Sequence, residues 1–83
     1  MKIIVTGGCG FIGSNFIRLA LEKLDNVEIL NIDKLSYAGN TENLENIHDF
    51  DNYRFLQGDI CDLNLLIDAF AGFDPTNIIH FAA

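Results

Sequence analysis

The sequence predicts an α/β fold in three layers, a parallel sheet with the element order βαβαβαβ. Short apolar segments alternate with longer segments whose apolar residues recur at helical spacing. Glycine, proline and asparagine separate these segments, and no repeat or low-complexity tract interrupts them. Alternation of this kind gives parallel strands joined by right-handed crossover helices, which cover both faces of the sheet.

The chain opens with a short apolar strand that runs directly into a glycine-rich loop and then into a helix. Gly7, Gly10 and Gly13 are spaced G-x-x-G-x-x-G, and counting from Gly8 gives G-x-G-x-x-G. One glycine of such a loop permits a turn with positive φ, one lets the backbone approach phosphates, and one lets the helix pack on the strand. The helix N-terminus adds N–H groups and partial positive charge. The segment therefore predicts a site for the pyrophosphate of a dinucleotide.

The next helix and strand supply the context that a glycine motif needs. Apolar residues fill one broad face from Phe11 to Leu24, and a second buried strand follows over residues 27–32. That strand ends at Asp33, about 20 residues after Gly13, as in Rossmann-like dinucleotide sites. A carboxylate there accepts both hydroxyls of an adenosine ribose and repels the 2′-phosphate of NADP, so the sequence predicts NAD. The alternative, a strand-end turn residue without a ligand, is less favoured because the glycine motif is in register.

Four more elements complete the predicted fold. A loop over residues 34–40 leads to a short helix that Thr41 is expected to cap. The third strand covers residues 53–57, Asp62 is expected to cap the helix after it, and the fourth strand covers residues 77–81. The apolar residues expected to face the sheet from these two helices are Leu44, Ile47, Leu63, Leu65, Leu66, Ile67, Ala69 and Phe70.

Ligands of parallel sheets bind at the carboxyl ends of the strands, which directs attention to residues beyond the third and fourth strands. Asp59 can accept a hydrogen bond from an adenine amino group, with Ile60 beside the ring. A local turn former ahead of the helix is an equally open interpretation of Asp59. We expect His80 to be a packed strand histidine rather than a base, since its neighbours are apolar.

Composition excludes several classes of function. Twelve acidic and five basic residues give a net charge of −7, which argues against binding of nucleic acid or an anionic membrane surface. No apolar run approaches membrane-spanning length and no signal-peptide pattern precedes the first strand, so the cytoplasm is the expected compartment. Cys9 and Cys61 form no metal-ligand spacing with His48 or His80, and no metal site is predicted. Cys9 is interpreted as a small residue that fits beneath the cofactor rather than a nucleophile.

Four segments together resemble the extended short-chain dehydrogenase/reductases, and among these the dTDP-glucose 4,6-dehydratases. They are residues 5–14 (VTGGCGFIGS), 33–40 (DKLSYAGN), 58–62 (GDICD) and 80–83 (HFAA). The glycine motif is shared across that superfamily, whereas DKLSYAGN is much more specific to the dehydratases. The resemblance covers essentially the whole chain. It implies that residues 1–83 form the NAD-binding amino-terminal half of a doubly wound Rossmann-like domain.

The resemblance also implies roles for individual residues. Phe11 and Ile12 would lie at the pyrophosphate, residues 33–36 around the adenosine ribose, Asp59 and Ile60 at the adenine, and residues 81–83 toward the nicotinamide. In the family, NAD takes a hydride from C4 of the hexose, water is lost across C5 and C6, and the hydride returns to C6. The product is a 4-keto-6-deoxy sugar nucleotide, a precursor of rhamnose and other deoxysugars. The predicted cofactor-binding residues are Gly7, Gly10, Phe11, Ile12, Gly13, Asp33, Lys34, Leu35, Ser36, Asp59, Ile60, Phe81, Ala82 and Ala83.

No catalytic residue is predicted, because the superfamily's Tyr-x-x-x-Lys pair does not occur. At that spacing Tyr37 is followed by Thr41, and Tyr53 by Gln57. The isolated chain is therefore expected to lack dehydration activity. Three alternatives stay open: part of a dTDP-glucose 4,6-dehydratase, part of another NAD-dependent sugar-nucleotide epimerase or dehydratase, and a stand-alone nucleotide-binding module. The free edge of the strand over residues 77–81 also predicts pairing with a second copy into a homodimer.

Overall fold

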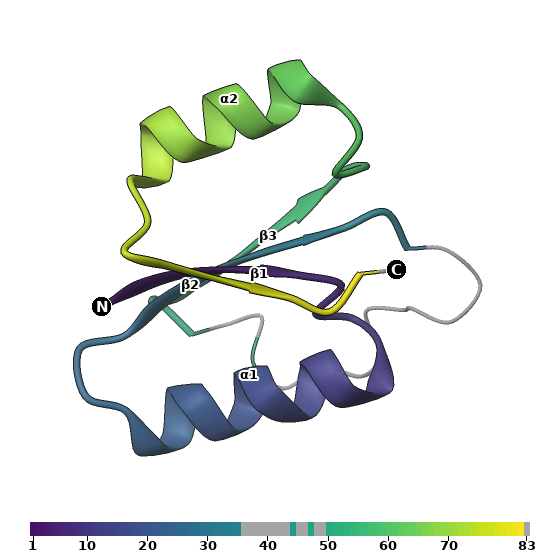
Figure 1. Ribbon diagram of the computed structural model, residues 1–83. Helices are drawn as coiled ribbons and strands as arrows, with labels where there is room; N and C mark the ends of the chain where they lie inside the picture. Colours follow the sequence, from purple (N-terminus) through teal and green to yellow (C-terminus); the bar gives the residue numbers. More distant parts are fainter. Residues whose placement is uncertain (36–43, 45–46, 48–49, 83) are drawn as a thin grey trace.

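A computed structural model describes residues 1–35, 44, 47 and 50–82 of the chain (Figure 1). The elements are, in chain order, β1 (Lys2–Thr6), α1 (Phe11–Lys23), β2 (Glu28–Asp33), β3 (Tyr53–Gln57), α2 (Leu63–Phe73) and β4 (Asn77–His80). The short helix expected after Thr41 falls largely outside the described residues. Leu44 and Ile47, which were expected on its inner face, are both buried.

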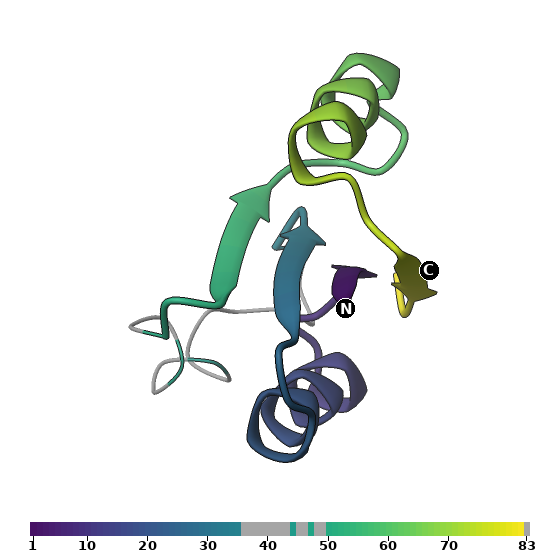
Figure 2. The same cartoon turned by 90° about the vertical axis from the view of Figure 1, so that its left-hand side faces the viewer.

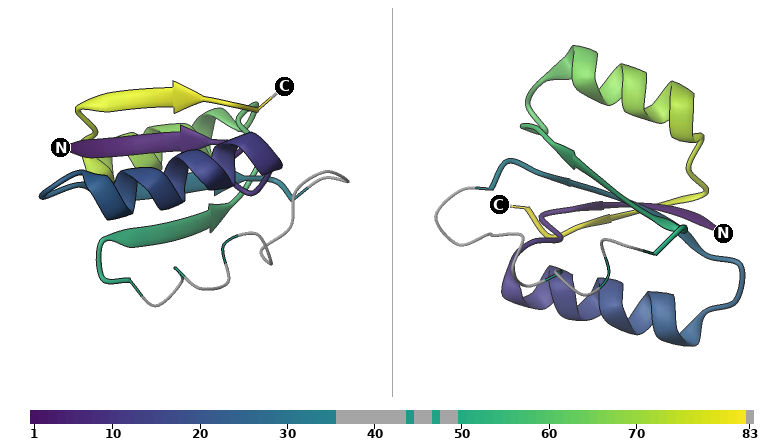
Figure 3. Two further views of the ribbon diagram at one scale, coloured as in Figure 1. Left: turned by 90° about the horizontal axis from the view of Figure 1, so that it is seen from below. Right: turned by 180° about the vertical axis from the view of Figure 1, so that it is seen from behind.

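The four strands form one parallel sheet in the order β3-β2-β1-β4. Figure 3 shows the strand arrows pointing the same way, and Figure 2 shows α1 and α2 on opposite faces of the sheet. The chain moves outward from β1 to β2 and β3, then returns to place β4 on the other side of β1. This order equals the first four strands of a doubly wound dinucleotide-binding sheet, so the predicted fold class is confirmed.

Side chains on the central strands alternate between two cores, as the two-residue period of a strand requires. Ile3 and Val5 of β1 pack on the α1 side, whereas Ile4 packs on the α2 side. On β2, Ile29 lies with the first group and Leu30 with the second. Both faces of these strands are therefore covered, which explains why they appear in the sequence as nearly continuous apolar runs.

The ends of the elements follow local capping. α1 ends at Lys23, one residue earlier than expected, where the Leu24 N–H still donates to the Ala20 carbonyl at 3.0 Å. α2 begins after Asp62, as predicted, and one Asp62 carboxylate oxygen accepts the Leu65 N–H at 3.2 Å. Among the helices that the structure describes, none combines the length and apolar character needed to cross a membrane.

Candidate functional site

The carboxyl ends of the strands bring most of the predicted site residues to one edge of the sheet. The glycine loop leaves β1 there, Asp33 ends β2, Asp59 and Ile60 follow β3, and Phe81 follows β4 (Figure 1). The strand order reverses between β1 and β4, and at such a switch point the two connections diverge and open a crevice for a ligand. Ser36 and Ala83, which are also predicted site residues, lie outside the described part of the chain.

The glycines of the loop have different physical roles. Gly7 has φ +72°, and a Cβ there would lie 2.6 Å from the backbone nitrogen of Ala82 beyond β4. A Cβ at Gly13 would overlap the Gly7 carbonyl oxygen and lie 2.8 Å from the Cα of Gly8. At Gly10, by contrast, the nearest atom would be 3.6 Å away. Gly7 and Gly13 therefore close the loop against β4 and α1, whereas Gly10 leaves open space above the loop.

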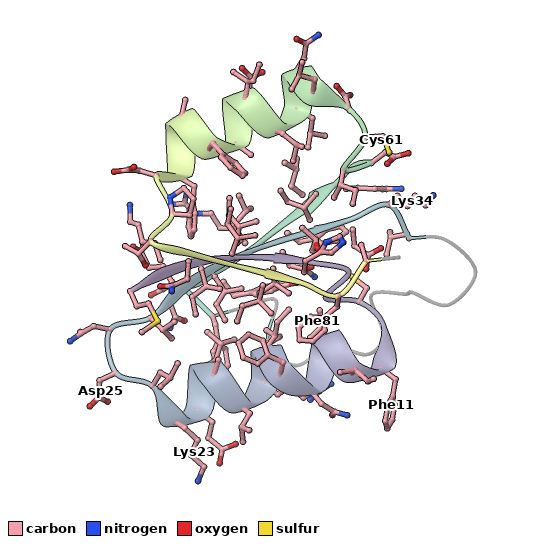
Figure 4. The ribbon with its side chains drawn as sticks, in the orientation of Figure 1. Phe11, Lys23, Asp25, Lys34, Cys61 and Phe81 are labelled. Carbon is pink, nitrogen blue, oxygen red and sulfur yellow. The ribbon has the colours of Figure 1, made fainter. Side chains whose placement is uncertain are left out.

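The N-terminus of α1 is open to an anion. Its N-cap, Gly10, has no side chain to accept a hydrogen bond, and the first turn carries no acidic residue. The first intrahelical bond runs from the Ser14 N–H to the Gly10 carbonyl at 2.9 Å, so the N–H groups of Phe11 and Ile12 precede the helical ladder. The Phe11 and Ile12 side chains are exposed, and Figure 4 shows Phe11 directed away from the sheet. The helix dipole adds partial positive charge at the same point.

Asp33 connects the glycine loop to the segment after β2. One carboxylate oxygen accepts the Cys9 N–H at 2.9 Å, and the other accepts the Leu35 N–H at 2.8 Å. The side chain is half-buried, and each carboxylate oxygen can accept more than one hydrogen bond. Asp33 is thus held in one orientation with acceptor capacity left over, the geometry needed to bind a pair of ribose hydroxyls. Lys34, next in the chain, is exposed.

Beneath the loop lies a buried polar group that the sequence did not predict, the amide of Asn31. Its oxygen accepts the Gly8 N–H at 2.9 Å, and its nitrogen donates to the Tyr53 hydroxyl at 3.1 Å and the Cys9 sulfur at 3.4 Å. The signal in the sequence is an asparagine in the middle of an apolar strand, between Leu30 and Ile32.

The cysteine and tyrosine of this group are held in their neutral forms. Burial, together with the nearby Asp33 carboxylate, raises the pKa of the Cys9 thiol to about 11. Burial likewise raises the pKa of the Tyr53 hydroxyl to about 12. Cys9 is therefore not activated as a nucleophile, although it lies beside a helix N-terminus.

Asp59 fits both interpretations left open by the sequence. One of its carboxylate oxygens accepts the Cys61 N–H at 2.9 Å, and this hydrogen bond is the main cause that lowers the pKa of Asp59. The bond forms the turn that precedes α2, which is the turn-former role. Because Asp59 is exposed, its remaining lone pairs are accessible to a ligand. Ile60 beside it is half-buried.

The segment after β4 lies against the glycine loop and α1. The Phe81 N–H donates to the Thr6 carbonyl at 2.8 Å, and its ring packs against Phe16 of α1 with centroids 5.7 Å apart (Figure 4). The expectation for His80 was wrong: the ring is exposed rather than packed. The cause is that β4 lies at an edge of the sheet, where side chains stay accessible. The Nδ1 atom of His80 and the Oγ1 atom of Thr6 share a hydrogen bond of 2.5 Å.

Comparison with known proteins places the chain in a defined group. Residues 4–83 match the family model described as GDP-mannose 4,6 dehydratase. The whole chain is 49% identical to a probable dTDP-glucose 4,6-dehydratase of Sinorhizobium fredii and spans 23% of that protein. It is similar to the dTDP-glucose 4,6-dehydratase of Bacillus anthracis in complex with NAD, with a TM-score of 0.97 and 43% identity over the whole chain and 27% of that structure. It is also similar to the NAD-bound enzyme of Streptomyces venezuelae, with a TM-score of 0.92 and 41% identity over the whole chain and 26% of that structure. The chain thus spans about a quarter of the length of the relatives it matches.

Proposed function

Because the chain belongs to the family described as GDP-mannose 4,6 dehydratase, we propose that it is the NAD-binding amino-terminal half-domain of a dTDP-glucose 4,6-dehydratase. The observation that carries the proposal is the pairing of an open helix N-terminus with Asp33 at the switch point of the sheet. The whole enzyme would convert a nucleotide-linked glucose into its 4-keto-6-deoxy product. The proposed compartment of the whole enzyme is the cytoplasm.

The residues at the edge of the sheet fit such a cofactor. The pyrophosphate would take the N–H groups of Phe11 and Ile12 above the open space at Gly10, since backbone amides suit an anion in so acidic a chain. The ribose hydroxyls would take the remaining acceptor capacity of Asp33, with Lys34, Leu35 and Ser36 around them. Asp59 and Ile60 would meet the adenine, and residues 81–83 would follow the cofactor toward its nicotinamide.

When bound, the cofactor would supply reversible hydride transfer: it would accept a hydride from C4 of the hexose and donate it to C6. The residues of this chain bind and orient the cofactor. Of its two tyrosines, Tyr53 is buried in β3 with a raised pKa and contacts Asn31, so it holds its proton inside the sheet. Tyr53 is therefore not proposed as an acid or base of the reaction.

Calorimetric titration with NAD and NADP tests the proposal directly. We expect saturable binding that favours NAD, and an Asp33→Asn variant that loses about ten- to a hundredfold in NAD affinity, as expected for hydrogen bonds to a charged group. Affinity for NADP should change much less, since the removed carboxylate also repels the 2′-phosphate. Asp25→Asn is the matched control, because it makes the same charge change at the far end of α1 (Figure 4).

Three other outcomes have distinct meanings. Equal losses for NAD and NADP in Asp33→Asn would contradict the ribose role. Equal affinity for NAD and ADP would favour the stand-alone nucleotide-binding module, because only the adenosine and pyrophosphate half would then contribute. No binding by a chain that circular dichroism shows to be folded would overturn the cofactor assignment.

We also propose that, when residues 1–83 are present by themselves, two copies pair along β4. This strand bonds β1 on one side and lies at an edge of the sheet, with Ile78 exposed to 51%. Sedimentation equilibrium should show a dimer that Ile78→Lys dissociates, because a charge on an edge strand opposes pairing. A monomer at all concentrations would contradict this part of the proposal.

A further inference from the structure

The amide of Asn31 is completely buried in β2, at 0% exposure, and the proposed cofactor contacts do not use it. A buried amide without hydrogen-bond partners strongly destabilises a fold, so the presence of Asn31 in the core requires partners for both of its ends. Asn31 has them on both ends. Its oxygen accepts from the glycine loop, and its nitrogen donates to β3 and back to the loop.

Asn31 and Asp33 act on consecutive amides of the loop. They are two residues apart on β2, so their side chains share the face of the sheet that carries α1. Asn31 accepts the Gly8 N–H at 2.9 Å, and Asp33 accepts the Cys9 N–H at the same distance. β2 therefore fixes two successive peptide units immediately before the N-cap of α1.

Gly8 is tied to this arrangement by its own lack of a side chain. A Cβ at Gly8 would overlap the Oδ1 atom of Asn31 and lie 2.5 Å from Cδ1 of Ile17. A side chain at position 8 would therefore displace the Asn31 amide or Ile17, whereas glycine lets the Gly8 N–H approach the Asn31 oxygen without such a shift. The nitrogen at the other end of the amide donates to the Tyr53 hydroxyl at 3.1 Å and to the Cys9 sulfur at 3.4 Å, so the amide keeps a partner in the loop if the hydroxyl is removed. A line of contacts runs from β3 through β2 to the loop.

We propose that Asn31 is a positioning residue for the pyrophosphate half of the site. By holding Gly8, it fixes the direction in which the amides of Phe11 and Ile12 face a ligand. This inference rests on the proposed NAD binding. It predicts that Asn31 affects ligands that carry a diphosphate and leaves adenosine, which Asp33 binds, unaffected.

Titration of the full chain with adenosine, ADP and NAD tests the inference, with Asn31→Leu as the variant of similar volume. We expect at least a tenfold loss of affinity for ADP and NAD, and adenosine affinity within about twofold of the original. Asp33→Asn should instead lose affinity for all three ligands, adenosine included. A loss in Asn31→Leu that is equal for adenosine and ADP would overturn the positioning role.

Tyr53→Phe separates positioning from simple stabilisation. It removes the hydroxyl that bonds the Asn31 nitrogen but leaves the Gly8 bond in place. Thermal stability should fall, whereas ADP affinity should stay within about twofold. If ADP affinity instead follows melting temperature across Tyr53→Phe and Asn31→Leu, Asn31 is a structural group and the inference fails.

Hydrogen exchange tests whether Asn31 holds the Gly8 amide, and it can be measured even if Asn31→Leu does not fold. In the unaltered chain without ligand, we expect the Gly8 N–H to exchange slowly and the Phe11 and Ile12 N–H groups rapidly. A Gly8 amide that exchanges as fast as Phe11 would overturn the inference. If the unaltered chain binds none of the three ligands, the proposed function fails, and slow Gly8 exchange would then mark Asn31 as purely structural.

Discussion

The two helices cover opposite faces of one sheet but differ greatly in how closely they pack (Figure 2). α1 buries Gly13, Ser14, Ile17 and Ala20. α2 buries Phe73 near its end, whereas Leu63 and Ile67, both predicted to face the sheet, are exposed to 68% and 55%. The closely packed face is the one that carries the glycine loop. Accurate placement of backbone amides at a ligand requires a rigid support, and α1 provides it.

The helix N-termini differ in the same sense. Both α1 and α2 begin at the carboxyl edge of the sheet, so both direct a partial positive charge there. α1 begins at Gly10 without a side-chain cap, and α2 begins at Asp62, whose carboxylate occupies the Leu65 N–H. A carboxylate in that position would repel a phosphate. A helix N-terminus at the correct edge is thus insufficient for an anion site, because the capping residue decides whether the amides are available.

The difference in packing between the two helices is tested most strongly by truncating an isoleucine in each of them. Ile17 of α1 is completely buried, so Ile17→Ala should lower the free energy of unfolding by about 2–5 kcal/mol. Ile67→Ala in α2 should change it by about 0.5 kcal/mol or less. Urea denaturation of both variants measures the difference. Similar losses at the two positions would show that α2 packs on the sheet in solution as closely as α1.

High pH should weaken the α1 side through its two buried acids. The pKa values of Cys9 and Tyr53 are raised from 9.0 and 10.0 to about 11 and about 12. The unfolded chain loses these protons first. The stability that they contribute is therefore present below about pH 9 and is lost as the pH rises through 11 and 12. Each group adds a slope of about 1.4 kcal/mol per pH unit within its own window.

Tyr53→Phe isolates one part of that slope. Urea unfolding between pH 8 and pH 11.5 should show a shallower decline in the variant above pH 10, whatever its stability at pH 8. Because the two proteins differ only in this hydroxyl, the difference between their slopes reports on Tyr53. Parallel declines would mean that the Tyr53 hydroxyl is accessible to water in the folded chain.

Replacement of a glycine by alanine should change the free energy of unfolding in opposite directions in the two helices. A Cβ at Gly13 meets the backbone of Gly7 and Gly8, which cannot move aside, so Gly13→Ala should destabilise by roughly 1–3 kcal/mol and weaken NAD binding. A Cβ at Gly72 of α2 meets nothing within 4 Å. Gly72→Ala should therefore stabilise by about 0.5–1 kcal/mol, because alanine favours the helix. Thermal melts with calorimetric titration test the pair, and a stabilising Gly13→Ala would refute the close packing of the loop.

Features set by local sequence could be predicted, and those set by strand register could not. The strand Tyr53–Gln57 is predicted from the residue types of a short segment, and the start of α2 is predicted from the capping residue Asp62. Both predictions are confirmed. The role of Asn31 depends on a glycine 23 residues earlier in the chain, which only the pairing of β1 with β2 brings into contact. The free edge of β4 was predicted, but the exposure of His80 was not, because the burial of a strand side chain depends on what covers that face of the sheet and not on its neighbours in the sequence.

The smallest effect tests the cap that distinguishes the N-terminus of α2 from that of α1. Asp62→Ala removes the acceptor for the Leu65 N–H and should lower the free energy of unfolding by about 1 kcal/mol. Asp62→Asn keeps an acceptor oxygen and loses only the charge, so it should differ from the unaltered chain by a few tenths of a kcal/mol. Because Asp62 caps α2, whereas the proposed pyrophosphate site lies at the N-terminus of α1, neither variant should alter NAD affinity. Denaturation and titration of both variants measure the effects on stability and on affinity. A change in NAD affinity would mean that the α2 N-terminus takes part in the cofactor site, and the contrast between the two helices would then lie in packing alone.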